Sequence, residues 1–217
     1  MKGRSKKRMR KAFRKLLILA ICLLVFAVSG CGGGSPAPVS DTGAIHLNNY
    51  SSATIDRIYL APVENASLGS DIFTDLLYPN AVLLMPNISP DSYDAKIGVN
   101  GRYSDYFAYA YDIPIEAGNT ITLNIYNDSF TGSLEICNKT LAAKNIIGIY
   151  LVPADASSWG ENQISSAIVP SGVIHLYDLD PGPYKVKVVR EDLSESIYDG
   201  ASGITIDSLT LTTLNVY

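Results

Sequence analysis

The sequence predicts an all-β protein with two tandem antiparallel β-sandwich modules, and three observations lead to this prediction. Apolar and polar residues alternate over short runs, which is the pattern of a strand with one buried face and one wet face. Clusters of Pro, Gly, Asn, Asp and Ser separate these runs at a spacing typical of strands. The third observation is an internal repeat at a constant offset of 91 residues.

Alternation of period two recurs along the chain after residue 43. In residues 185–188 the two valines face one side of the predicted strand and the two lysines face the other. Residues 95–99 and 121–125 also have an apolar residue at every second position. The connecting segments 70–77 and 161–168 could each hold one helical turn. We therefore expect six or seven short strands in each module, packed as two sheets.

The repeat divides the chain after residue 43 into two similar halves. About 18 of some 70 aligned positions are identical without a gap, and only the first strand requires a shift of two residues. We therefore predict one module over 44–128 and a second over 129–217, each long enough to bury a core of its own. The best-matching segments are 58–62 with 149–153, 90–96 with 181–187, and 123–126 with 214–217.

The N-terminal segment has the features of a secretory signal. Nine of the 17 basic residues precede residue 16, and residues 16–28 form an unbroken apolar run of 13 residues. As a helix this run would measure about 20 Å, which is shorter than the hydrocarbon core of a bilayer, about 30 Å. The pattern predicts a signal peptide over residues 1–30. Residues 31–43, rich in Gly, Ser and Pro, are expected to form a flexible tether.

The residues that end the signal, Val28-Ser29-Gly30-Cys31, resemble the lipobox of bacterial lipoproteins. This resemblance implies cleavage before Cys31 and acylation of its sulfur and its new amine, which anchors the protein to a membrane. The implied location is the cell envelope. Because Gly32 rather than Asp follows the cysteine, the resemblance favours the outer membrane in an organism that has one, with the body facing the periplasm or the surface.

One segment of the repeat resembles known β-sandwich modules. The segment Leu179-x-Pro181-Gly182-x-Tyr184-x-Val186-x-Val188 resembles β-sandwich modules of secreted bacterial proteins, and prealbumin-like or carboxypeptidase regulatory-like sandwiches. The resemblance implies an Ig-like or prealbumin-like fold. In the first module, Asp91 occupies the position of Gly182 and Leu68 that of Trp159. These departures indicate that the motif is architectural.

Charge excludes one class of partner. After residue 30 the chain keeps eight basic and 21 acidic residues, a net charge of −13. Nucleic-acid binding requires a basic surface that displaces phosphate counterions, so we expect no nucleic-acid partner.

The sequence offers little chemistry that could support catalysis. His46 and His175 do not recur between the modules, and no base is expected beside Cys137, which is interpreted as a half-buried free thiol. Loop carboxylates at the sandwich ends could bind calcium, but no Asp-x-Asp-x-Asp-Gly loop supports this. We expect no cofactor, no metal site and no enzymatic activity.

Aromatic residues are the candidate binding groups. Tyrosine is abundant, 14 in the chain, and it crowds residues 103–111 of the first module. The candidates are Tyr103, Tyr106, Tyr109, Tyr111 and Trp159. An alternative interpretation places the tyrosines in a core strand or module contact. For Trp159 the alternative is an apolar residue that packs in the core, because Leu68 occupies the aligned position of the first module.

The predicted function is that of a non-catalytic, lipid-anchored envelope lipoprotein with a binding or structural role. The alternative is an adhesin-like or assembly component that recognises a protein or glycan through residues 103–111. A carbohydrate-active enzyme is a remote alternative, since any acidic β protein contains carboxylate pairs.

Overall fold

The computed structural model describes residues 41–101, 104–140 and 144–217, and it confirms the all-β prediction. The described residues form thirteen strands and two three-residue 3-10 helices, η1 (Asn127–Ser129) and η2 (Gly200–Ser202). The predicted signal peptide, acylated Cys31, most of the tether and Tyr103 lie outside the described residues. In the described part of the chain, no helix is both long enough and apolar enough to cross a membrane.

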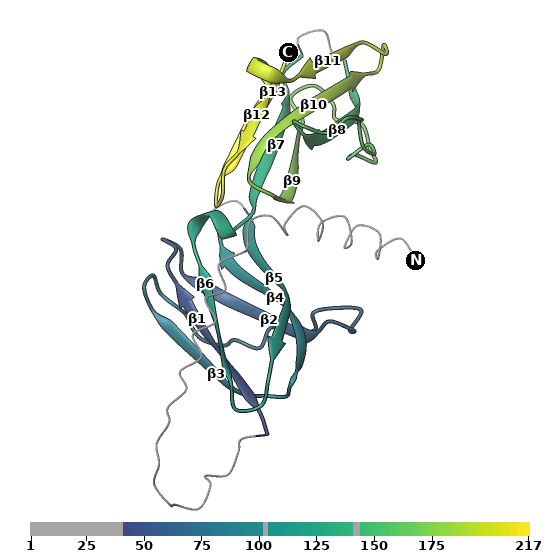
Figure 1. Cartoon of the computed structure of the whole chain (residues 1–217). Helices are drawn as coiled ribbons and strands as arrows, with labels where there is room; N and C mark the ends of the chain where they lie inside the picture. Colours follow the sequence, from purple (N-terminus) through teal and green to yellow (C-terminus); the bar gives the residue numbers. More distant parts are fainter. Residues whose placement is uncertain (1–40, 102–103, 141–143) are drawn as a thin grey trace, which may run out of the picture. The chain divides into compact units, whose positions relative to one another are not determined.

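Residues 43–125 form one pair of three-stranded sheets. The strand order is β3-β1-β6 in one sheet and β2-β4-β5 in the other (Figure 1). Ile45 and Leu47 of β1 and Ile97 of β4 are fully buried, so the core lies between the two sheets. The strands are β1 (Gly43–Asn49), β2 (Ile55–Pro62), β3 (Val82–Ile88), β4 (Asp91–Asn100), β5 (Asp105–Ile115) and β6 (Thr120–Ile125).

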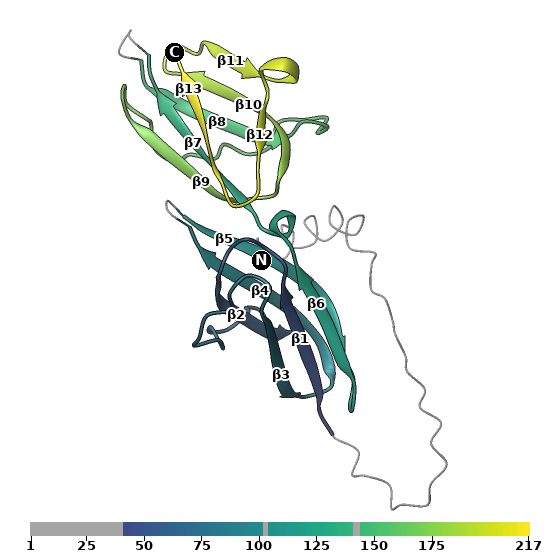
Figure 2. The same cartoon turned by 90° about the vertical axis from the view of Figure 1, so that its left-hand side faces the viewer.

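Residues 132–216 form a second pair of sheets. One has the order β13-β7-β9; in the other, β10 pairs with β8, β11 and β12 (Figure 2). Ile136 of β7, Ile149 of β8 and Val188 of β10 are fully buried between them. The strands are β7 (Gly132–Asn138), β8 (Ile146–Pro153), β9 (Val173–Leu179), β10 (Gly182–Arg190), β11 (Glu195–Tyr198), β12 (Ile204–Ile206) and β13 (Leu211–Val216).

Each pair of sheets contains one parallel pairing among its antiparallel ones. β1 pairs with β6 in parallel, and β7 pairs with β13 in parallel. Alternation of apolar residues reports which face of a strand is buried but not the direction of its neighbour, so the sequence did not distinguish these pairings.

The two expected helical turns, at 70–77 and 161–168, are not formed. In each segment one side-chain oxygen bonds to a strand amide as well as to a loop amide: Asp71 Oδ1 accepts from the amides of Ile58 in β2 and of Phe73, at 2.9 and 3.0 Å. Asn162 Oδ1 accepts in the same way from Ile149 and Ile164, at 2.9 and 3.2 Å. These local bonds hold the segments as extended loops against β2 and β8.

A buried asparagine closes each of the strands β1 and β7. Asn49 donates to the carbonyl oxygens of Ala53 and Leu77 at 2.8 and 2.9 Å. Asn138 donates to those of Lys144 and Ile168 at 3.0 and 2.9 Å. Each asparagine amide therefore gives two loop carbonyls a second donor, beside the backbone amide or hydroxyl from which each already accepts, and ties the loop to the end of the strand.

Candidate functional site

Aromatic and cationic side chains gather on the outer face of the β2-β4-β5 sheet. We define the aromatic–cationic face as Arg57, Tyr59, Lys96, Phe107 and Tyr109. Strand register assembles it: Lys96 of β4 pairs with Tyr59 on one side and with Tyr109 on the other. Directly paired residues share one side of a sheet, so three neighbouring strands each contribute to one row. All five side chains are half-buried.

Lys96 is the centre of this face. Its Nζ lies 3.5 Å from the ring centroid of Phe107 and 5.8 Å from the centroids of Tyr59 and Tyr109. An ammonium at these distances is attracted by the negative faces of the rings. Burial lowers the pKa of Lys96 below its ordinary value. The nearby charge of Asp178 opposes this shift, as does that of Asp105, and the positive charge of Arg57 adds to it.

Gly98 makes room for this arrangement. It lies between Arg57 of β2 and Phe107 of β5 in the next row of the sheet. A Cβ atom at Gly98 would lie 3.1 Å from Cε1 of Phe107 and 3.2 Å from Cβ of Arg57, which is tighter than ordinary contact. Because that space is free of a side chain, the guanidinium carbon of Arg57 lies 5.4 Å from the Phe107 centroid.

Two carboxylates fix Arg57 in place. Its Nη1 donates to Asp105 Oδ2 at 2.6 Å, and its Nε donates to Asp56 Oδ1 at 3.0 Å. The hydrogen bond from Arg57 holds the pKa of Asp105 below its usual value. The guanidinium is thus oriented beside the rings, and the aromatic–cationic face combines apolar ring surface with two fixed positive charges.

The predicted binding tyrosines divide between this face and the core. Tyr109 belongs to the face; its hydroxyl donates to Asp178 Oδ2 at 2.9 Å, and its ring stacks on Tyr111 with centroids 6.0 Å apart. Tyr106 is only 4% exposed and packs among the core residues of the first sheet pair, so it adds nothing to the outer face. Sequence reasoning missed Tyr59, Lys96 and Arg57, because only the strand register brings them to residues 107–109.

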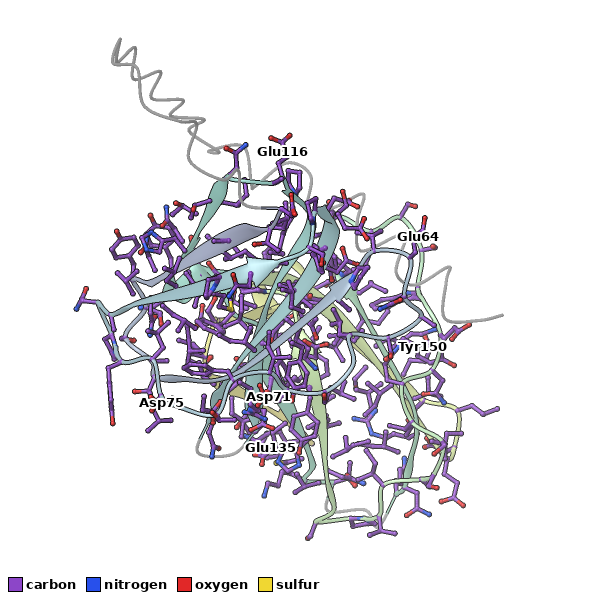
Figure 3. The ribbon with its side chains drawn as sticks, turned by 90° about the horizontal axis from the view of Figure 1, so that it is seen from below. Glu64, Asp71, Asp75, Glu116, Glu135 and Tyr150 are labelled. Atoms are coloured by element: carbon purple, nitrogen blue, oxygen red, sulfur yellow. The ribbon has the colours of Figure 1, made fainter. Side chains whose placement is uncertain are left out.

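Trp159 is half-buried beside lysines. Its ring centroid lies 5.3 Å from Nζ of Lys185 and 5.7 Å from Nζ of Lys187. Lys187 also lies over Tyr150, 4.6 Å from that centroid; Figure 3 labels Tyr150, which belongs to β8. The loop after β8 thus brings Trp159 to the outward-facing lysines of β10.

Cys137 has an acid and a histidine near it, neither of which the sequence indicated. Glu135 Oε1 accepts from the thiol at 3.4 Å, and Glu135 Oε2 lies 3.1 Å from His175 Nε2 (Figure 3 labels Glu135). The residues meet because β7 pairs Glu135 with His175 of β9. No pattern in the sequence specifies that register.

The arrangement of Glu135 and His175 does not activate the Cys137 thiol. Glu135, not His175, contacts Cys137, so the histidine is not placed to accept the thiol proton. Burial and the hydrogen bond to Glu135 raise the pKa of Cys137 above its ordinary value, which favours the unreactive thiol form. Among the described residues, no cluster of three or more His, Cys, Asp or Glu side chains is arranged to hold a metal ion.

No protein-family model matches the chain, and no curated protein matches it in sequence. Solved structures that match include the Bacillus anthracis TIE protein, at 14% identity over 81% of this chain and 34% of that chain, with a TM-score of 0.31. A candidate adhesin from Bacteroides ovatus matches at 11% identity over 88% and 98% of the two chains, with a TM-score of 0.30. The shaft pilin SpaA from Lactobacillus rhamnosus GG, as a D295N mutant, matches at 10% identity over 80% and 97%, with a TM-score of 0.26.

The chain therefore spans about a third of the TIE protein. At these identities and TM-scores the similarities carry no argument about function.

Proposed function

We propose that this chain is a lipid-anchored, non-catalytic binding protein of the bacterial cell envelope, adhesin-like in role. Its partner, a protein or a glycan, rests on the aromatic–cationic face. The observation that carries the proposal is the Lys96 ammonium held against three aromatic rings on the outer side of the β2-β4-β5 sheet. Aromatic residues and arginine are the side chains most often found at the energetic centres of recognition surfaces.

Charge supports recognition over a purely structural role. Arg57 and Lys96 are two of only eight basic residues after residue 30, in a body with 21 acidic residues. Asp56 and Asp105 neutralise Arg57, so the positive charge that this face offers a partner is that of Lys96, which lies among half-buried rings that supply apolar area. A partner with an apolar surface and an acidic or hydrogen-bond-accepting group fits this face.

A non-catalytic role agrees with the chemistry of the second sheet pair. Cys137 has titratable neighbours, but its raised pKa and lack of contact with His175 oppose nucleophilic attack. The chemistry around Cys137 therefore agrees with a binding function, which needs no reactive group.

The anchor can be tested by metabolic labelling. We expect palmitate to be incorporated into the native chain and into Cys22→Ser, and to be lost in Cys31→Ser, because only Cys31 stands at the end of the lipobox-like segment. Gel fluorography of cells fed labelled palmitate measures this. Labelling that persists in Cys31→Ser would refute the anchor.

The binding face can be tested with fluorescent vesicles that carry the acylated chain. We expect retention on at least one surface in a panel coated with mucin, peptidoglycan, collagen or fibronectin. Phe107→Ala and Lys96→Met should each lower retention about tenfold, because each removes one side of the ring–ammonium contact.

The control for this experiment is Tyr78→Ala. Tyr78 is 60% exposed and lies outside the aromatic–cationic face, so its loss should leave retention unchanged. Circular dichroism of each variant checks that the strands remain folded. Equal retention of the native chain and both face variants, or no retention on any surface, would contradict the proposed function.

A further inference from the structure

A second group of rings and lysines lies on the outer side of β8 and β10. We define the second cationic face as Tyr150, Trp159, Lys185 and Lys187. The two lysines are separated by one residue of β10, so both point to the same side of the sheet, about 7 Å apart along the strand. Trp159 lies within 6 Å of both ammonium nitrogens, measured from its ring centroid as 5.3 and 5.7 Å.

The positive charge here is only partly neutralised. Lys187 Nζ lies 3.5 Å from Glu195 Oε1, which is a carboxylate partner. Lys185 Nζ donates to the main-chain oxygen of Ala156 at 2.5 Å, and among the described residues it forms no ion pair. An ammonium has three donors, so Lys185 keeps donors and its full charge for an acidic group.

From this geometry we infer that the second cationic face is a binding site for a short acidic oligosaccharide. The half-buried indole of Trp159 would contact the apolar side of a sugar ring, and Lys185 would pair with the carboxylate of a hexuronate. Lys187, held between Tyr150 and Trp159, adds a second positive charge at the next outward position of the strand.

The size of the ligand follows from charge. Residues 131–217 carry ten acidic and five basic residues, and the whole body after residue 30 carries −13, so a long polyanion would be repelled outside the two-lysine face. A ligand with one or two carboxylates can satisfy the local positive charge without meeting the surrounding acids. This distinguishes an acidic oligosaccharide from a nucleic acid, whose phosphates are closely spaced.

The single tryptophan of the chain reports on this site directly. Digalacturonate added to the purified full chain should change Trp159 fluorescence in a saturable way, and the affinity should fall with rising salt. Its methyl ester, the same disaccharide without charge, should bind about tenfold more weakly, as the ion pair with Lys185 is lost. Equal binding of the acid and the ester would overturn the assignment of an acidic ligand.

Variants separate the roles of ring and charge. Lys185→Gln should weaken digalacturonate binding about tenfold by the same fluorescence titration. Trp159→Leu, which installs the residue that stands at the matching position 68, should abolish detectable heat in isothermal titration calorimetry. Lys144→Gln is the matched control, since Lys144 pairs with Asp192 away from Trp159 and its loss should change nothing.

The result of the digalacturonate experiments is independent of the proposed function, because the aromatic–cationic face contains none of the residues of the second cationic face. Thermal unfolding of Lys185→Gln and Trp159→Leu should match that of the native chain, which excludes misfolding as the cause of lost binding. Absence of any saturable fluorescence change with digalacturonate, or unaltered binding by Trp159→Leu, would refute the site.

Discussion

Asn138→Ala is expected to destabilise residues 132–216 by about 3 kcal/mol. The Asn138 side chain is completely buried, and its amide nitrogen donates to the carbonyl oxygens of Lys144 and Ile168. Its Oδ1 accepts from the amide and the hydroxyl of Thr140, at 3.2 and 2.6 Å. Alanine would remove these four hydrogen bonds, each contributing about 1 kcal/mol, and would leave the Thr140 amide without its partner. The two carbonyls keep one donor each, the Ile146 amide and the Thr140 hydroxyl.

Trp159 fluorescence during urea unfolding measures this effect, because the only tryptophan lies within residues 132–216. The matching variant Asn49→Ala should act similarly on residues 43–125, where hydrogen exchange of β1 is the readout; Asn49 fastens Ala53 and Leu77 in the same manner.

Asn48→Ala is the control, since the amide of Asn48 makes an exposed bond to Asn124 at 2.8 Å. We expect a change below about 1 kcal/mol for that variant. If Asn49→Ala were no more destabilising than Asn48→Ala, the hydrogen bonds from the buried Asn49 amide to the loop would not stabilise the fold.

The strands themselves were predictable from the sequence because burial imposes period two. Val186 and Val188 are fully buried while Lys185 and Lys187 remain half-exposed, as alternation alone required. The loops were less predictable. Asp71 and Asn162 were not recognised as acceptors of backbone amides, and helical turns were expected in their place.

The candidate site was predicted only in part, because it depends on register. Tyr109 could be singled out from the local concentration of tyrosines, yet Tyr59 and Lys96 lie 50 and 13 residues before it in the chain. Only the pairing of β2 with β4 and of β4 with β5 places them in one row. The same concentration of tyrosines led to a wrong prediction for Tyr106. Successive side chains of a strand point to opposite faces, so Tyr106 points to the core while its neighbour Phe107 points outward.

Gly132→Ala is the second change from which we expect a large loss of stability. Gly132 begins β7 where β12 passes closely: a Cβ atom there would lie 2.3 Å from the carbonyl oxygen of Asp207 and 2.6 Å from Cγ2 of Ile206. The oxygen belongs to the backbone and Ile206 is 1% exposed, so neither can move without displacing a strand. Overpacking of this kind costs about 3 kcal/mol.

The midpoint of urea unfolding, followed by circular dichroism and by Trp159 fluorescence, measures the loss. Gly160→Ala is the matched control: its new Cβ would meet only Cγ1 of Val152, at 3.5 Å, which is ordinary contact. The control should therefore unfold at the same urea concentration as the native chain. A native-like midpoint for Gly132→Ala would mean that β7 and β12 can separate at this point without loss of packing, and hence that the close approach does not fix the position of β12 beside β7.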